Sequence, residues 1–93
     1  MQLLKNKKAV VTGGTKGIGK AIATSFYANG ADVVILGTND QRGNDTVKEI
    51  QQEGVDQRVS YYQVNVADYG SVEKVLKEIL LKEGTIDILV NNA

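Results

Sequence analysis

The stretch Val10–Lys20, Val-Val-Thr-Gly-Gly-Thr-Lys-Gly-Ile-Gly-Lys, decides the fold of this chain. It passes from a short apolar run through glycines into a helical pattern, which predicts a strand, a tight turn and the start of a helix. The first backbone N–H groups of a helix have no partner within the helix, and they lie at the positive end of its dipole. The stretch therefore predicts a site for a phosphate group.

The glycines of this turn have separate expected tasks. Gly13 allows the chain to turn sharply after the strand, and Gly17 allows a pyrophosphate to approach the backbone. Gly19 allows the new helix to lie against the strand. The predicted loop site as a whole comprises Gly13, Gly14, Thr15, Lys16, Gly17, Ile18 and Gly19.

A second phosphate-binding motif overlaps the same residues. Gly14–Lys20 satisfies G-x-x-x-x-G-K, the start of the loop that binds nucleoside triphosphates. The next residue is Ala21, where that motif needs a Ser or Thr hydroxyl to bind magnesium. Because the metal site would be incomplete, we favour a dinucleotide over a nucleoside triphosphate.

Composition narrows the class of protein. The 93 residues carry 11 basic and 11 acidic side chains, and this balance indicates neither a nucleic-acid partner nor a membrane partner. The absence of Cys and His removes disulfides and the commonest metal ligands, so no metal site is expected. The N-terminal residues do not resemble a signal peptide, and no run is long enough to span a membrane, so we expect a cytoplasmic protein.

Apolar runs predict four strands, over residues 9–12, 31–36, 59–66 and 86–90. A helix after the first strand is expected to bury one face and to end at Gly30. That face consists of Ile18, Ala21, Ile22, Ser25 and Phe26.

Two further helices are predicted between the later strands. One is capped by Asn39 or Asp40 and runs to about residue 53, where Gly54 stops it; Val47 and Ile50 face inward, and Gly43 weakens its first turn. The other starts after Asp68, ends near Gly84, and has an inner face of Val72, Val75, Leu76, Ile79 and Leu80. The resulting β-α-β-α-β-α-β order predicts an α/β fold with parallel strands joined by right-handed crossovers.

The pattern Thr-Gly-x-x-x-Gly-Ile-Gly over residues 12–19 resembles the short-chain dehydrogenase/reductase family. Asn91-Asn92-Ala93, after the fourth strand, is similar to the Asn-Asn-Ala-Gly motif of that family. Read without the family, the two Asn side chains satisfy loop backbone groups at a strand end. The resemblance implies a Rossmann-like, doubly wound parallel sheet in a three-layer αβα sandwich. Residues 1–93 would be the N-terminal dinucleotide-binding half of a single domain.

The tip of the second strand indicates which dinucleotide is bound. In dinucleotide-binding folds an Asp or Glu there accepts hydrogen bonds from a free ribose 2′-hydroxyl and repels a 2′-phosphate. Here the tip reads Gly37-Thr38-Asn39, and Lys16 brings a positive charge to the same region. Asp40 lies close by in sequence and favours the opposite choice. We predict NADPH rather than NADH, with Lys16, Thr38 and Asn39 at the phosphorylated ribose.

Two further positions are assigned from the resemblance. Asn65 and Val66, at the end of the third strand, resemble the residues that contact the adenine in the family. Asn92 resembles the residue that contacts the ribose nearer the nicotinamide. Read without the family, Asn65 is simply a polar strand end.

Family members reduce carbonyls with a tyrosine as proton donor and a lysine four residues later. None of the four tyrosines, Tyr27, Tyr61, Tyr62 and Tyr69, has this lysine, and we interpret them as packing residues. We therefore predict no catalytic residue in this sequence. The catalytic groups are expected beyond Ala93 in a longer protein, and the fourth strand would expose an unpaired edge without the strand that follows it in the family.

The resemblance is closest to the 3-oxoacyl-[acyl-carrier-protein] reductases of fatty acid synthesis. It implies an NADPH-dependent carbonyl reductase acting on a small-molecule or acyl-carrier-protein-linked 3-oxo substrate, and a homotetramer for the full protein. Related reductases of sugars or steroids share these motifs. One alternative is a dinucleotide-binding module without catalysis, and another is a self-associating structural fragment.

Overall fold

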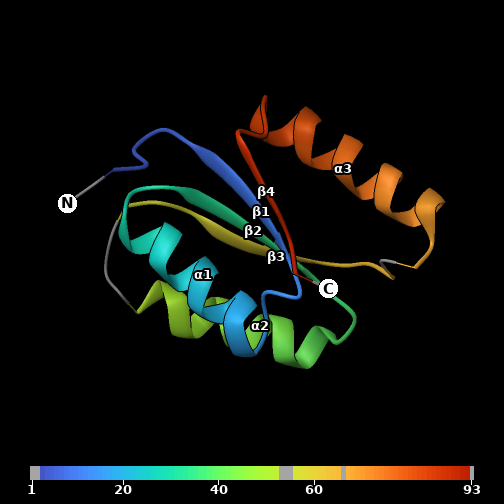
Figure 1. The fold of residues 1–93 in the computed structure, drawn as a ribbon, viewed down its shortest axis with the longest axis horizontal. Coiled ribbons are helices and arrows are strands. Elements are labelled where there is room, and N and C mark those ends of the chain that lie inside the picture. The colour runs from blue at the N-terminus through green and yellow to red at the C-terminus, as the bar shows by residue number, and fades with distance from the viewer. Residues whose placement is uncertain (1–2, 53–55, 66, 93) are drawn as a thin grey trace.

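The computed structural model describes residues 3–52, 56–65 and 67–92. Strands and helices alternate as β1 (Lys8–Thr12), α1 (Gly17–Ala28), β2 (Asp32–Gly37), α2 (Asp40–Gln51), β3 (Val59–Gln63), α3 (Tyr69–Glu83) and β4 (Ile88–Asn91). This is the predicted β-α-β-α-β-α-β order. Figure 1 shows α1 and α2 on one face of the sheet and α3 on the other.

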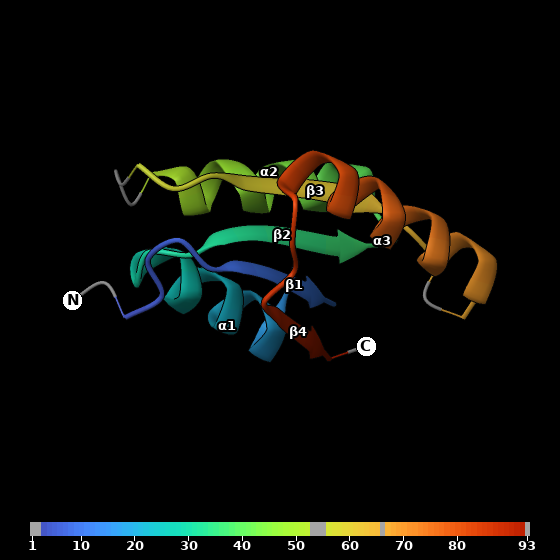
Figure 2. The same ribbon diagram turned by 90° about the horizontal axis from the view of Figure 1, so that it is seen from above.

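The sheet is parallel, with strand order β3-β2-β1-β4. Its register places Val11 of β1 opposite Ile35 of β2 and Val90 of β4. The arrows of β1, β2 and β4 point the same way in Figure 2. The carboxyl ends of all four strands therefore meet at one edge, where ligands bind in open α/β sheets.

Strand β2, one of the two inner strands, contributes side chains to the core on both faces of the sheet. Val33 and Ile35 are buried with residues of α1 and α2, whereas Val34 and Leu36 are buried on the opposite face with Ile79 of α3. Successive side chains of a strand point to opposite faces, so a continuous apolar run is buried on both sides. This is the arrangement that the sequence predicts for residues 31–36.

The buried face of α1 differs from the predicted face. Gly19, Ala23 and Tyr27 are buried, Ile22 and Phe26 are partly buried, and three predicted members, Ile18, Ala21 and Ser25, are exposed. A Cβ built on Gly19 would lie 2.1 Å from the Gly13 carbonyl oxygen, so the first turn of α1 can lie this close to the glycine turn only with glycine at position 19. The helix ends at Ala28, with Asn29 as C-cap, and Gly30 follows with φ 105°.

The caps of α3 are confirmed, but its inner face was predicted too wide. Asp68 accepts hydrogen bonds from the N–H groups of Gly70 and Ser71, and Gly84 ends the helix in the left-handed conformation. Val72, Val75 and Leu76 pack against the core and Ile79 is buried. Leu80, by contrast, is 44% exposed. Tyr69 is 92% exposed, so its interpretation as a packing residue was wrong. The start of α3 extends past the ends of the strands (Figure 2).

The other element boundaries move by a few residues. Helix α2 has Asn39 as its N-cap and ends at Gln51, and the predicted stop at Gly54 lies outside the described residues. Strand β3 ends at Gln63 rather than at residue 66, and β4 begins at Ile88 rather than at residue 86.

Four charged residues join the amino-terminal ends of the strands to the end of α3. Lys8 forms ion pairs with Asp32 and Glu83, and Arg58 lies 2.6 Å from Glu83 and 3.6 Å from Asp32. Burial by itself would raise the pKa of Asp32, but the Arg58 N–H and the Lys8 ammonium outweigh it and hold that pKa below its usual value. The network lies at the end of the sheet opposite the glycine turn.

Candidate functional site

The glycine turn takes the predicted form of a sharp exit from β1 into α1. Gly13 has φ 65° and donates its N–H to the Leu36 carbonyl at 2.9 Å, which ties the turn to β2. Gly17 has φ 59°, and a Cβ built there has no described heavy atom within 4 Å. The positive φ at both positions favours glycine, and the open space beside Gly17 leaves its backbone accessible.

The amino terminus of α1 differs from those of the other two helices. The N-cap Lys16 has an extended backbone, and no side chain among the described residues caps the helix or places a carboxylate in its first turn. In contrast, Asn39 caps α2 and Asp68 caps α3. The first N–H groups of α1 are therefore left for an anion, at the positive end of the helix dipole.

A cavity of about 580 Å³ opens in front of these N–H groups. It is lined by residues from the glycine turn, the tip of β2, α2, the end of β3 and the end of β4. Among the predicted site residues, it brings together Gly13, Thr15, Lys16, Gly17, Ile18, Thr38 and Asn92. The other lining residues are Leu36, Gly37, Arg42 and Val64.

Two predicted glycines lie under the turn instead of lining the cavity. A Cβ on Gly14 would meet Ile35 Cγ2 at 2.8 Å, and one on Gly19 would meet the Asn92 Nδ2 atom at 2.6 Å. Gly14 lets the turn lie against Ile35 of β2, and Gly19 lets α1 lie against the Gly13 backbone and Asn92. Gly14 and Gly19 therefore affect the site through the position of the turn and of α1, and they do not line the cavity.

Asn92 is held at the cavity by the end of β1. Its N–H donates to Thr12 Oγ1 at 2.9 Å, and the Thr12 hydroxyl lies 3.3 Å from both the Val90 carbonyl oxygen and Asn91 Oδ1. The two family-like motifs, 80 residues apart in sequence, thus meet directly. This contact also connects the edge strand β4 to the glycine turn.

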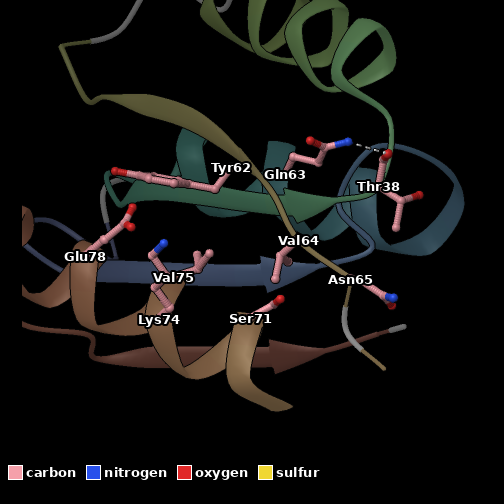
Figure 3. A pocket seen from close by; sticks show the side chains of 9 residues that line it. All are labelled: Thr38, Tyr62, Gln63, Val64, Asn65, Ser71, Lys74, Val75 and Glu78. Carbon is pink, nitrogen blue, oxygen red and sulfur yellow. Dashed lines mark hydrogen bonds between the residues drawn. The ribbon is translucent and has the colours of Figure 1, made fainter. Parts of the chain in front are cut away.

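Asn39 and Asn65 lie next to this cavity. The Asn39 side-chain oxygen accepts from the Arg42 N–H at 2.9 Å, which makes Asn39 the cap of α2. Asn65 lines a second cavity of about 710 Å³ between β3 and α3. Figure 3 shows Asn65 extending away from Lys74 and Glu78, with Thr38 across the opening. Val66, the other predicted adenine contact, lies outside the described residues.

The two cavities are neighbours, because Thr38 and Val64 line both. Gln63 donates to the Thr38 carbonyl at 3.2 Å, which fixes the β2 tip against β3 (Figure 3). The Asn65 side-chain oxygen accepts from the Ala67 N–H at 3.0 Å, so its amide N–H₂ remains to donate. A planar polar ring could rest on Val64 with its edge near this amide.

The charged side chains that line the 580 Å³ cavity are both positive. No carboxylate of the described residues lines the 580 Å³ cavity, whereas Lys16 and Arg42 both do. Burial and then the Asp40 carboxylate raise the pKa of the Tyr61 hydroxyl, and Asp40 does not line this cavity. Sequence reasoning missed Arg42; its signal was the cap at Asn39, which puts position 42 in the first turn of α2.

Two other classes of site find no support in the described part of the chain. No group of three or more Asp, Glu, His or Cys side chains there is arranged to hold a metal ion. None of the described helices has the length and apolar character required to cross a membrane.

A bare helix terminus after a glycine turn, at the carboxyl edge of a parallel sheet, defines the class of Rossmann-like dinucleotide-binding folds. Comparison with known sequences narrows this class. The pattern of the short chain dehydrogenase family matches residues 7–93. The chain belongs to the short-chain dehydrogenase/reductase family of oxidoreductases.

The individual relatives differ in the substrates that their names state. The chain is 43% identical over 90 residues to the 3-oxoacyl-[acyl-carrier-protein] reductase FabG of Chlamydia pneumoniae, covering 97% of this chain and 36% of that protein. It is 35% identical to a 3alpha-hydroxysteroid dehydrogenase of Mediterraneibacter gnavus, covering 98% and 36%. The structure of L-sorbose reductase from Gluconobacter frateurii, complexed with NADPH and L-sorbose, matches with a TM-score of 0.91 at 34% identity, covering 100% and 35%. The chain thus spans about a third of the length of these relatives.

Proposed function

We propose that this chain is the cofactor-binding part of an NADPH-dependent carbonyl reductase. The observation that carries the proposal is the uncapped terminus of α1, which opens on the 580 Å³ cavity. In this proposal Gly13–Gly19 bind the pyrophosphate through backbone N–H groups. Lys16, Thr38 and Asn39 serve the adenosine ribose, Asn65 and Val66 the adenine, and Asn92 the second ribose.

The choice of NADPH over NADH rests on charge at the tip of β2. Gly37 occupies the position where dinucleotide-binding folds can carry an Asp or Glu that binds the ribose and would repel a 2′-phosphate. Lys16 lines the same cavity as Gly37. The match to a sugar reductase complexed with NADPH supports this choice by analogy. A phosphate dianion gains more from these surroundings than a neutral hydroxyl does.

The nicotinamide, when bound, supplies the hydride for carbonyl reduction. The task proposed for this chain is to bind the cofactor and fix its direction, with Asn92 on the side nearer the nicotinamide. Reduction also needs an acid for the carbonyl oxygen, and no tyrosine here has a lysine four residues later. We therefore assign the proton donor to a part of the whole protein outside these 93 residues, and we expect the 93-residue chain to be inactive.

The proposed substrate is a 3-oxoacyl-[acyl-carrier-protein], reduced to the 3-hydroxyacyl form in fatty acid synthesis, with a homotetramer as the full assembly. Similarity to FabG supports this choice. Similarity to steroid and sugar enzymes at comparable identity keeps the substrate class open. A non-catalytic dinucleotide-binding module is the alternative, because it requires no proton donor.

Calorimetric titration of the 93-residue chain with NADPH and with NADH tests cofactor binding. We expect both to bind and NADPH to bind more tightly; binding of neither would refute the proposed function. NADPH oxidation with an acetoacetyl thioester then tests the division of tasks, because turnover by the 93-residue chain would contradict the assignment of the proton donor. The intact mass of the source protein checks whether sequence follows Ala93.

A further inference from the structure

We infer that Arg42, in the first turn of α2, binds the adenosine 2′-phosphate together with Lys16 and determines the preference for NADPH. The inference rests on the proposed function and adds a residue from a different element to the site. Lys16 belongs to the glycine turn, whereas Arg42 lines the same cavity from the first turn of α2. Gly37 and Thr38, at the tip of β2, line this cavity as well.

Both the N–H and the carbonyl of the Arg42 backbone form hydrogen bonds with side chains. Its N–H donates to Asn39 Oδ1 at 2.9 Å, and its carbonyl accepts from Thr46 Oγ1 at 2.8 Å. The same Thr46 hydroxyl lies 3.3 Å from the Thr15 carbonyl oxygen in the glycine turn, and Thr46 is buried. The first turn of α2 is therefore held against the glycine turn before any ligand binds.

Asp45 and Glu49 line an adjoining cavity together with Lys16 and Arg42, but both carboxylates have other partners. Asp45 lies 3.2 Å from the Gln41 side-chain amide, and Glu49 pairs with Lys20. None of the ion pairs found among the described residues includes Lys16 or Arg42. Lys16 and Arg42 thus line the 580 Å³ cavity, and none of the described carboxylates lines it with them.

This arrangement fits a phosphate dianion better than a hydroxyl group. A guanidinium donates two parallel N–H bonds to phosphate oxygens, and the pairing is strongest when both groups are charged. A ribose 2′-hydroxyl offers Arg42 neither charge nor a second oxygen. Loss of Arg42 should therefore weaken NADPH binding and leave NADH binding nearly unchanged.

The test compares the dissociation constants of NADPH and NADH for the wild-type 93-residue chain and three variants. Arg42→Ala should weaken NADPH binding by about tenfold or more, as expected for a lost charged hydrogen bond, and NADH binding by less than about twofold. Arg42→Lys keeps the charge without the fork and should fall between Arg42→Ala and wild type. Lys48→Ala is the matched control, because it removes an exposed positive charge from the same helix away from the cavity.

The outcomes separate this inference from the proposed function. If the wild-type chain binds neither dinucleotide, the proposed function fails and the inference fails with it. If it binds NADPH but Arg42→Ala leaves that affinity unchanged, or weakens both dinucleotides equally, only the assignment of Arg42 is overturned. Circular dichroism melting of each variant identifies a loss of fold, and Arg42→Lys supplies the comparison if Arg42→Ala melts early.

Discussion

A methyl group added at Gly17 should weaken cofactor binding, and its cost in stability can be matched by a second substitution elsewhere in the chain. Gly17 has φ 59° and faces open space in front of the α1 terminus. Gly84, at the end of α3, has φ 86° and also has no described atom within 4 Å of a built Cβ. Gly84→Ala therefore imposes the same kind of backbone strain as Gly17→Ala, far from the cavity.

The magnitude follows from the left-handed backbone. An alanine at positive φ costs about 1–2 kcal/mol, and each kcal/mol lowers the melting temperature of a domain of this size by roughly 4–8 °C. Both variants should show this loss. Only Gly17→Ala places a methyl group where the pyrophosphate is proposed to contact the backbone, and losing one or more charged hydrogen bonds there should weaken binding by about tenfold to a hundredfold.

Thermal melting and calorimetric titration with NADPH and NADH measure the two effects separately. Gly17→Ala should weaken both dinucleotides equally, because both carry the pyrophosphate. Equal dinucleotide affinity in Gly17→Ala and Gly84→Ala would refute the proposal that the ligand lies against the glycine turn. A much larger loss of melting temperature at Gly17 than at Gly84 would show that the turn has a structural task beyond accepting a ligand.

Two further substitutions test the packing behind the site, and a third tests the ion network. Gly43→Ala should destabilise the fold by about 1–3 kcal/mol, because its Cβ would lie 2.4 Å from the Tyr61 ring. This loss should exceed the gain from the higher helix propensity of alanine. Denaturant unfolding should show that Gly43→Ala costs less stability in the Tyr61→Leu background. Gly14→Ala should destabilise for the same reason, and Ile35→Leu, which removes the Cγ2 methyl at 2.8 Å, should lessen that loss in a double-mutant cycle. The pKa of Asp32 is lower in the folded chain than its unfolded value of about 3.9, so the ionised carboxylate stabilises the fold above that pH. This contribution disappears as the pH falls through the lower pKa of the folded state, so the melting temperature of the wild type should drop toward that of Asp32→Asn below about pH 4. Melting temperatures that fall in parallel for the two proteins would contradict this prediction.

Local patterns determined the order of elements and several of their ends. The ends of α3, at the Asp68 cap and the left-handed Gly84, depend on residues within about four positions of one another. The apolar run of β2 reflects burial of the strand on both faces. Interactions at that range repeat with the period of the helix or strand, so the sequence displays them directly. The glycine turn, which we propose binds phosphate, is of this kind, because its glycines and the following helix are adjacent in the chain.

Only the tertiary structure decided which side of each element faces its neighbours and which side chains share the cavity. The contact of Gly19 with Gly13 rotates α1 so that Ile18 is 72% exposed, and the Tyr61 ring explains a glycine at position 43 of a helix. Arg42 reaches the cavity because Thr46 holds α2 against the glycine turn. These contacts join residues from separate crossover units, and nothing in the local period of either segment encodes the distance between them.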